Sequence, residues 1–207
     1  LDFPILPSEP VTPAPMRSRT GGFLPECMVE TDRGFIQARD VKPGDMVYTF
    51  DGGEQEVKAV RHAVPRMTTL IHVPAGALGN DSDLSLPADQ MVALEIDAIE
   101  RLFGLPVAVV KLISLVGYKG IKAIAPERLG RIHIECEEEE LIWAESGMLM
   151  QAGEAGEDSA FKTLSVTETR QVLASEEGRA LATTGIEGED ARYPNFLQEL
   201  LQGSKAA

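Results

Sequence analysis

The stretch GGFLPECMVETDRGFIQARDVKPGDMVYTFDGG, residues 21–53, decides the fold of this chain. Its run CMVET, residues 27–31, alternates between small or apolar and larger or polar side chains, the period of two that is typical of a strand. The segments TDRG and VKPGD carry the residues that tight turns require, and DGG fits a hairpin turn after the strand-like run MVYTF. Short strands separated by tight turns at this spacing predict an antiparallel β body.

The same pattern continues beyond this stretch. The runs EVKAVRHAV, TTLIHV and RIHIECE predict three further strands. The last run places Ile132, Ile134 and Cys136 on one face and Arg131, His133 and Glu135 on the other. One short helix, from about Asp97 to Phe103, interrupts an otherwise all-β body.

Both ends of the chain differ from this body. Residues 1–20 contain five prolines, which exclude helix and sheet ladders and favour an extended, flexible arm. Ser165 and Glu168 form a capping box that predicts a helix over VTETRQVLAS, and Asn195 can cap a final short helix, FLQELLQ. We therefore divide the chain into an arm (1–20), a β domain (21–175) and a helical tail (176–207).

Composition excludes several classes of partner. The formal net charge of −14 argues against nucleic acids and anionic membranes, because both would repel the chain. Two cysteines are too few for a disulfide framework. The most apolar region, near residues 102–116, is broken by glycine, proline and lysine, so we expect no membrane span. No secretory signal is visible, and both a cytoplasmic and a secreted location fit the sequence.

The order of residues in the opening stretch resembles the start of Hint (hedgehog/intein) domains, and above all their stand-alone bacterial subgroup. The matching positions are Gly34, Ile36, Asp40-Val41, Gly44-Asp45 and the run Thr49 to Gly52. Further segments resemble the same subgroup: HVPAGALGNDSDLSL, IERLFG and RIHIECEEEELIWAESGMLMQAG. The resemblance implies a flat horseshoe of curved antiparallel hairpins and a bacterial source.

The resemblance also implies a chemistry, in which the first Cys or Ser of the domain attacks the carbonyl just before it. Such a site needs an accessible thiolate, a histidine to move protons and donors for the oxyanion. In the family the nucleophile lies twelve residues before the turn glycine, and that position is Gly22 here. Cys27 falls where the family carries a threonine inside the first strand, so we interpret it as a packed strand residue.

Two further working positions depart from the family pattern. Where the family reads Ser-Pro-Asp-His, this chain reads Pro-Ala-Asp-Gln and ends on Gln90, whose amide cannot exchange a proton near neutral pH. Glu139 stands where the subgroup carries a late histidine, whereas His133 matches another histidine of the subgroup. We predict a catalytically degenerate Hint-like domain without cofactor or metal. It would act as a binding or regulatory module for a protein partner or for an upstream domain of the same chain.

Two alternatives remain at this point. The first is residual autoprocessing with Cys27 as nucleophile and His133 or His72 as base, which requires a thiol and an imidazole close together. The second is Ca²⁺ binding by the acidic run of Glu135 and Glu137 to Glu140. Alternation along a strand would send neighbouring carboxylates to opposite faces, so a solvated acidic edge is the simpler interpretation of that run.

Overall fold

The computed structural model describes residues 21–51, 53–153 and 159–183. This part of the chain contains the strands β1 Met28–Thr31, β2 Gly34–Gln37, β3 Met46–Thr49, β4 Gly53–Glu56, β5 Ala59–Val73, β6 Leu84–Pro87, β7 Met91–Leu94, β8 Ala108–Lys111, β9 Lys122–Glu135, β10 Glu140–Trp143 and β11 Leu149–Ala152. It also contains the helices α1 Asp97–Phe103 and α2 Val166–Thr183. The predicted N-terminal arm and the predicted final helix lie outside the described residues.

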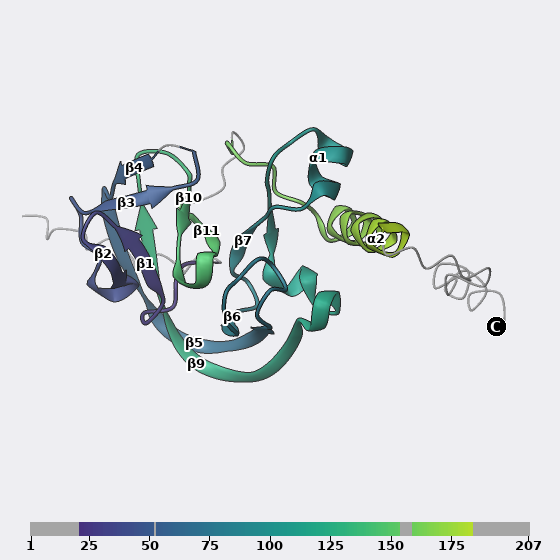
Figure 1. Ribbon diagram of the computed structural model, residues 1–207. Helices are drawn as coiled ribbons and strands as arrows, with labels where there is room; N and C mark the ends of the chain where they lie inside the picture. Colours follow the sequence, from purple (N-terminus) through teal and green to yellow (C-terminus); the bar gives the residue numbers. More distant parts are fainter. Residues whose placement is uncertain (1–20, 52, 154–158, 184–207) are drawn as a thin grey trace, which may run out of the picture.

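The strands form two antiparallel sheets, which confirms the predicted fold class. The larger sheet has the order β2-β1-β3-β10-β11-β7-β8, with β4 paired to β3, and the smaller has the order β6-β5-β9. In Figure 1, β5 and β9 make a long curved ribbon that runs from the β1–β3 end of the molecule to the β6 and β7 end. This curved ribbon joins the two ends of the horseshoe.

Two prolines explain how the ribbon bends. The pairing register of β5 with β9 shifts between Ala63 and Arg66, where Pro65 lies, and shifts again opposite Pro126. A proline cannot donate to a strand ladder, and a bulge is where a strand tolerates it. Our prediction of two separate strands over this part was therefore wrong: β5 is continuous, because the bulges accommodate the residues that looked like breaks.

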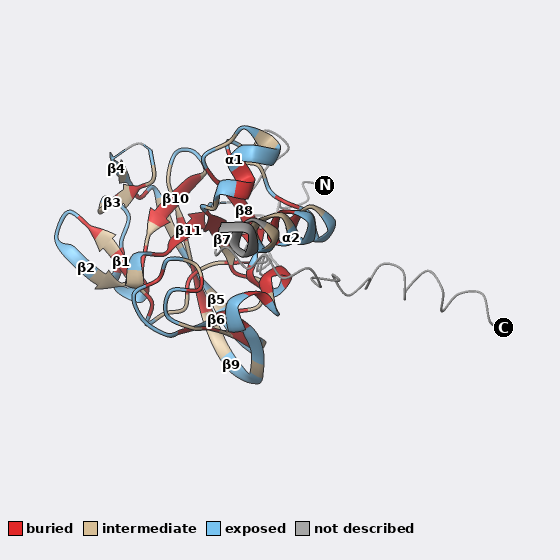
Figure 2. Cartoon of the chain, turned by 45° about the vertical axis from the view of Figure 1, so that its right-hand side comes forward, coloured by how far each residue is buried: buried red, intermediate tan, exposed pale blue. Residues whose placement is uncertain are grey.

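The core lies between the hairpins. Val29 of β1 and Val47 of β3 are completely buried while their strand neighbours are partly exposed, as the period of two requires. Burial of such a side chain contributes roughly 1.5–3 kcal/mol to stability. Figure 2 shows buried residues concentrated in β7, β10 and β11 and exposed ones at the bend of β9. Trp143 is partly buried and packs against a second, smaller apolar cluster that includes Leu141 and Phe161.

Both helices follow their sequence signals. α1 has the predicted bounds and ends at Gly104, whose φ of 67° is the left-handed conformation that glycine adopts easily. The predicted capping box precedes α2: the Ser165 N–H donates to a Glu168 carboxylate oxygen (2.9 Å), and the Glu168 N–H donates to Ser165 Oγ (3.2 Å). α2 continues across residue 175, where we placed a domain boundary, and that division stays a prediction.

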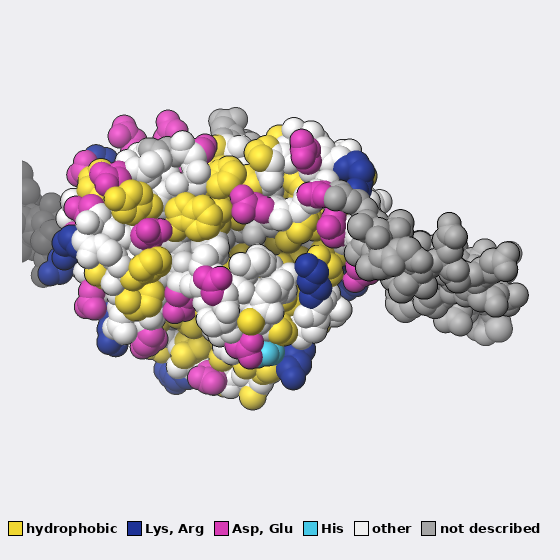
Figure 3. Space-filling model, viewed as in Figure 1, with side chains coloured by type: hydrophobic (Ala, Val, Ile, Leu, Met, Phe, Trp, Pro, Cys, Tyr) yellow, Lys and Arg dark blue, Asp and Glu magenta, His cyan; other side chains and the backbone are white. Residues whose placement is uncertain are grey.

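The acidic composition is visible on the surface. Figure 3 shows Asp and Glu side chains spread over the whole face in view, with fewer Lys and Arg among them. Of the helices in the described residues, none is both long enough and apolar enough to cross a membrane.

Candidate functional site

The start of the domain is fixed to the ribbon by a short antiparallel bridge. The Phe23 N–H donates to the Ile132 carbonyl (2.8 Å), and the Ile132 N–H donates to the Phe23 carbonyl (2.9 Å). Both side chains are buried in the main core, with exposed fractions of 1% and 3%. The bridge therefore places Gly22, the residue before Phe23, next to the strand β9.

The residue that lies beside Gly22 is His133. A Cβ atom added at Gly22 would lie 2.9 Å from Cε1 and 3.0 Å from Nδ1 of the His133 imidazole, closer than real side chains approach. Gly22 also has a φ of +84°, a conformation that side chains rarely adopt. The imidazole thus occupies the space in which the side chain of a nucleophile at position 22 would begin.

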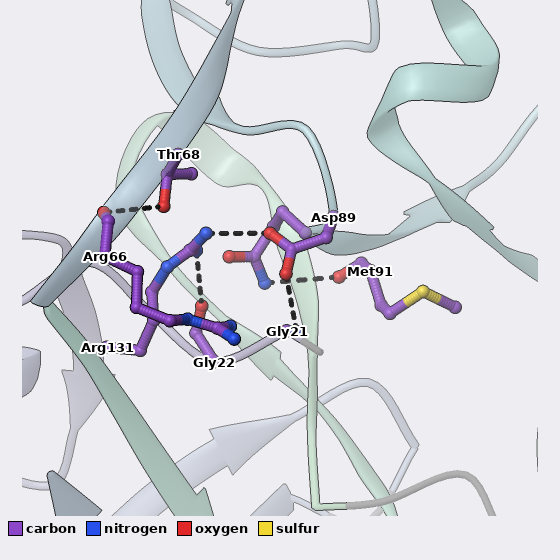
Figure 4. A network of polar contacts seen from close by, with 8 residues as sticks. Gly21, Gly22, Arg66, Thr68, Asp89, Met91 and Arg131 are labelled. Carbon is purple, nitrogen blue, oxygen red and sulfur yellow. Dashed lines mark hydrogen bonds and ion pairs between the residues drawn. The ribbon is translucent and has the colours of Figure 1, made fainter. Parts of the chain in front are cut away.

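A polar network holds the backbone on either side of Gly22 (Figure 4). Asp89 accepts a hydrogen bond from the Gly21 N–H (3.2 Å) and forms an ion pair with Arg131 (2.7 Å). Arg131 Nη1 donates to the Gly22 carbonyl (3.4 Å). We call these four residues, Gly21, Gly22, Asp89 and Arg131, the backbone clamp.

Burial shapes the electrostatics of this site. The side chain of Arg131 is only 5% exposed; burial lowers its pKa, and the carboxylate of Asp89 opposes that shift. A guanidinium nevertheless stays charged in proteins. The pKa of His133 is also lowered, first by burial and then by the positive charges of Arg61 and Arg131. The lowered pKa favours the neutral imidazole at pH 7. The buried Nε2 of His133 has no hydrogen-bond partner among the described residues.

The other two family positions lie in different surroundings. Gln90, which follows Asp89 in the sequence, is completely buried. Its side-chain amide donates to the Met91 carbonyl (3.5 Å), whereas its Oε1 has no hydrogen-bond partner among the described residues. Glu139 instead accepts hydrogen bonds from Gln151, from Ser159 Oγ (2.5 Å) and from the Ala160 N–H (3.2 Å). Among the described residues, no hydrogen bond or ion pair joins Glu139 to the backbone clamp.

Cys27 lies immediately before β1 and faces the core. Its exposed fraction is 2%, and its backbone is held by hydrogen bonds to Leu24 and from Ala38. Burial raises the pKa of its thiol strongly, and the nearby carboxylate of Glu145 raises it further. In the part of the chain that the structure describes, no hydrogen bond joins Cys27 to a histidine.

We expect Cys27 to behave as a core residue in solution. Iodoacetamide at pH 8 should modify Cys136, which is half-buried and has a pKa raised to about 11, faster than Cys27. Cys27 should react only when the protein unfolds, and Cys27→Val should cost at most about 1.5 kcal/mol of unfolding free energy. Peptide mass spectrometry and urea denaturation measure these outcomes. Rapid labelling of Cys27 in the folded protein would contradict its assignment to the core.

The remaining candidate residues are His72 and the acidic run, and their side chains contact different residues. His72 Nε2 lies 3.9 Å from a carboxylate oxygen of Asp83. His72 is near the end of β5, whereas His133 of β9 pairs with Arg61 near the start of β5. In the acidic run, Glu135 pairs with Arg61, and Glu140 is 8% exposed with a pKa raised by burial and by neighbouring acids. Over residues 21–51, 53–153 and 159–183, no group of three or more His, Cys, Asp or Glu is arranged to hold a metal ion.

Sequence reasoning did not find the roles of Arg131 and Asp89. It placed Arg131 on the polar face of its strand and treated Asp89 only as the neighbour of Gln90. The two residues are 42 positions apart, and Arg131 is 109 positions from Gly22. An arginine on the polar face of a predicted strand and an aspartate in a family motif were the only signals available.

Solved structures and one family model are similar to this chain. The described fold resembles the crystal structure of the gp41-1 intein (13% identity, 65% of this chain, 100% of that chain, TM-score 0.40). It also resembles the solution structure of a bacterial intein-like domain from Clostridium thermocellum (15% identity, 64% of this chain, 99% of that chain, TM-score 0.39). No curated protein matches the sequence. The sequence model of the Hint domain matches residues 21–151, more than half of the chain, and the chain therefore belongs to the Hint domain family.

Proposed function

We propose that this chain is a Hint domain without autoprocessing activity, which keeps its upstream segment attached and acts as a binding or regulatory module. One observation carries the proposal: position 22 is a glycine, and the His133 imidazole fills the space where a nucleophile would project. An acyl shift needs a thiol or hydroxyl next to the carbonyl that it attacks, together with a base. Gly22 supplies no such group.

The backbone clamp supports the second part of the proposal. It engages the amide of Gly21 and the carbonyl of Gly22, which flank the bond that a processing relative would rearrange. The bridge between Phe23 and Ile132 adds two more backbone hydrogen bonds. These contacts hold Gly21, Gly22 and Phe23 on the domain, and we propose the upstream part of the same chain as the partner.

The proposal predicts that the chain does not cleave itself. Incubation for several days with dithiothreitol, or with hydroxylamine to trap an ester or thioester, should leave the intact mass at 22.4 kDa. Intact-mass spectrometry provides the measurement, and a heat-unfolded sample controls for chemical hydrolysis. A fragment that begins at Gly22 would overturn the proposal. A fragment that begins at Cys27 and is lost in Cys27→Ala would instead support residual autoprocessing.

A further inference from the structure

We propose that His133 makes the backbone clamp sensitive to protons: its neutral imidazole packs against Gly22, and its protonated form releases Gly21 and Gly22 together with the bridge between Phe23 and Ile132. We call His133 and the backbone clamp together the latch. The inference rests on the proposed function, because a latch is useful only where the upstream segment stays attached.

The first argument is steric and polar. The ring of His133 lies directly against the backbone of Gly22, so a movement of the ring removes the packing that fixes this residue. Its Nε2 is buried and has no hydrogen-bond partner among the described residues. A proton at that nitrogen would create a buried charge with an unsatisfied donor, which is costly unless the ring moves to solvent.

The second argument concerns the charged side chains that shift the pKa of His133. Arg61 and Arg66 of β5 and Arg131 of β9 oppose a charge on the imidazole, whereas Asp89 favours one. Arg61 lies directly opposite His133 in the strand pair and is itself paired with Glu135. Figure 4 shows the side chain of Arg66 extended towards the segment of Gly21 and Gly22. Asp89 pairs with Arg131 and Glu135 pairs with Arg61, and the net effect of burial and of these charges lowers the pKa of His133.

The direction of the pH dependence follows from the lowered pKa of His133. The closed latch binds a proton less readily than an open one, in which the histidine has an ordinary pKa of about 6.5. The closed state is therefore fully favoured above about pH 6.5. Its stability decreases as the pH falls below that value, until the lower pKa of the closed state is reached.

Amide hydrogen exchange by NMR at pH 7.5 and pH 5.0 tests the pH dependence of the closed latch, with rates corrected for intrinsic exchange. The protection of the Phe23 amide, which bonds to Ile132, should fall at least about threefold on acidification. The Ala38 amide, which bonds to the Cys27 carbonyl at the same distance of 2.8 Å, is the internal control and should keep its protection. A parallel loss at both amides would indicate general unfolding and overturn the latch.

Two variants isolate the histidine. In His133→Gln the side chain cannot titrate, so the pH dependence at Phe23 should disappear, whereas His72→Gln should preserve it. If His133→Gln does not fold, the NMR titration of the His133 ring in the native chain replaces it; a pKa at or above the ordinary value would contradict the latch. Intact mass of the same samples separates the two proposals. A cleaved chain overturns the proposed function, and an intact chain with pH-independent protection overturns only the latch.

Discussion

Replacing Gly22 with alanine should lower the free energy of unfolding by about 2–6 kcal/mol. Two costs add at this position. A non-glycine residue at a φ of +84° is strained by about 1–3 kcal/mol. The new Cβ would also lie 2.9 Å from the His133 ring, and such overpacking costs about 1–3 kcal/mol. Urea denaturation followed by circular dichroism measures the loss.

Gly21→Ala is the matched control for this experiment. Gly21 has a φ of +93° but no atom within 4 Å of an added Cβ. Gly21→Ala should therefore lose only the unfolding free energy that corresponds to backbone strain. The difference between the two variants isolates the contact with His133. In the background of His133→Ala, Gly22→Ala should lose its steric cost, with a coupling energy of about 1–3 kcal/mol. Equal losses for the two glycines would contradict the close packing of His133 on Gly22.

Most of the fold could be predicted from local signals. Residues 28–31 alternate as a strand, the bounds of α1 follow from its pattern, and the capping box of Ser165 and Glu168 forms as expected. These features depend on residues a few positions apart. The ribbon of β5 and β9 was missed in part, because Pro65 suggests a break when read alone. Only the partner strand, which supplies the bulged pairing, makes a continuous strand possible there.

The sequence predicts which positions form the site, but it does not predict which residues contact one another there. The spacing to the turn glycine identified Gly22, and the mid-domain motif identified Gln90. The packing of His133 on Gly22 depends on a bridge between Phe23, at the start of the domain, and a strand more than a hundred residues later. Alternation assigned Arg131 to a polar face, yet the structure buries it, because the segment before Phe23 and the loop of Asp89 cover that face.

Replacing Asp89 with alanine is the second change for which we expect a large effect, about 2–4 kcal/mol of unfolding free energy. Removal of one partner from a buried ion pair leaves the other charge unpaired, and the side chain of Arg131 is only 5% exposed. The Gly21 N–H loses its acceptor as well. We place the effect below that of a completely buried pair, because the side chain of Asp89 is 29% exposed and water can reach it.

An exposed ion pair of this chain provides the comparison. Arg33 lies 2.9 Å from Asp45 with 56% of its side chain exposed, so Arg33→Ala should cost no more than about 1 kcal/mol. Arg131→Met in the background of Asp89→Ala removes the unpaired charge and should recover part of the lost stability. Urea denaturation of these three variants decides whether the loss in Asp89→Ala comes from the unpaired charge of Arg131 or from the lost contact of Gly21. If the double variant is no more stable than Asp89→Ala, the loss comes from the Gly21 contact; if it recovers, the loss comes from the buried charge of Arg131.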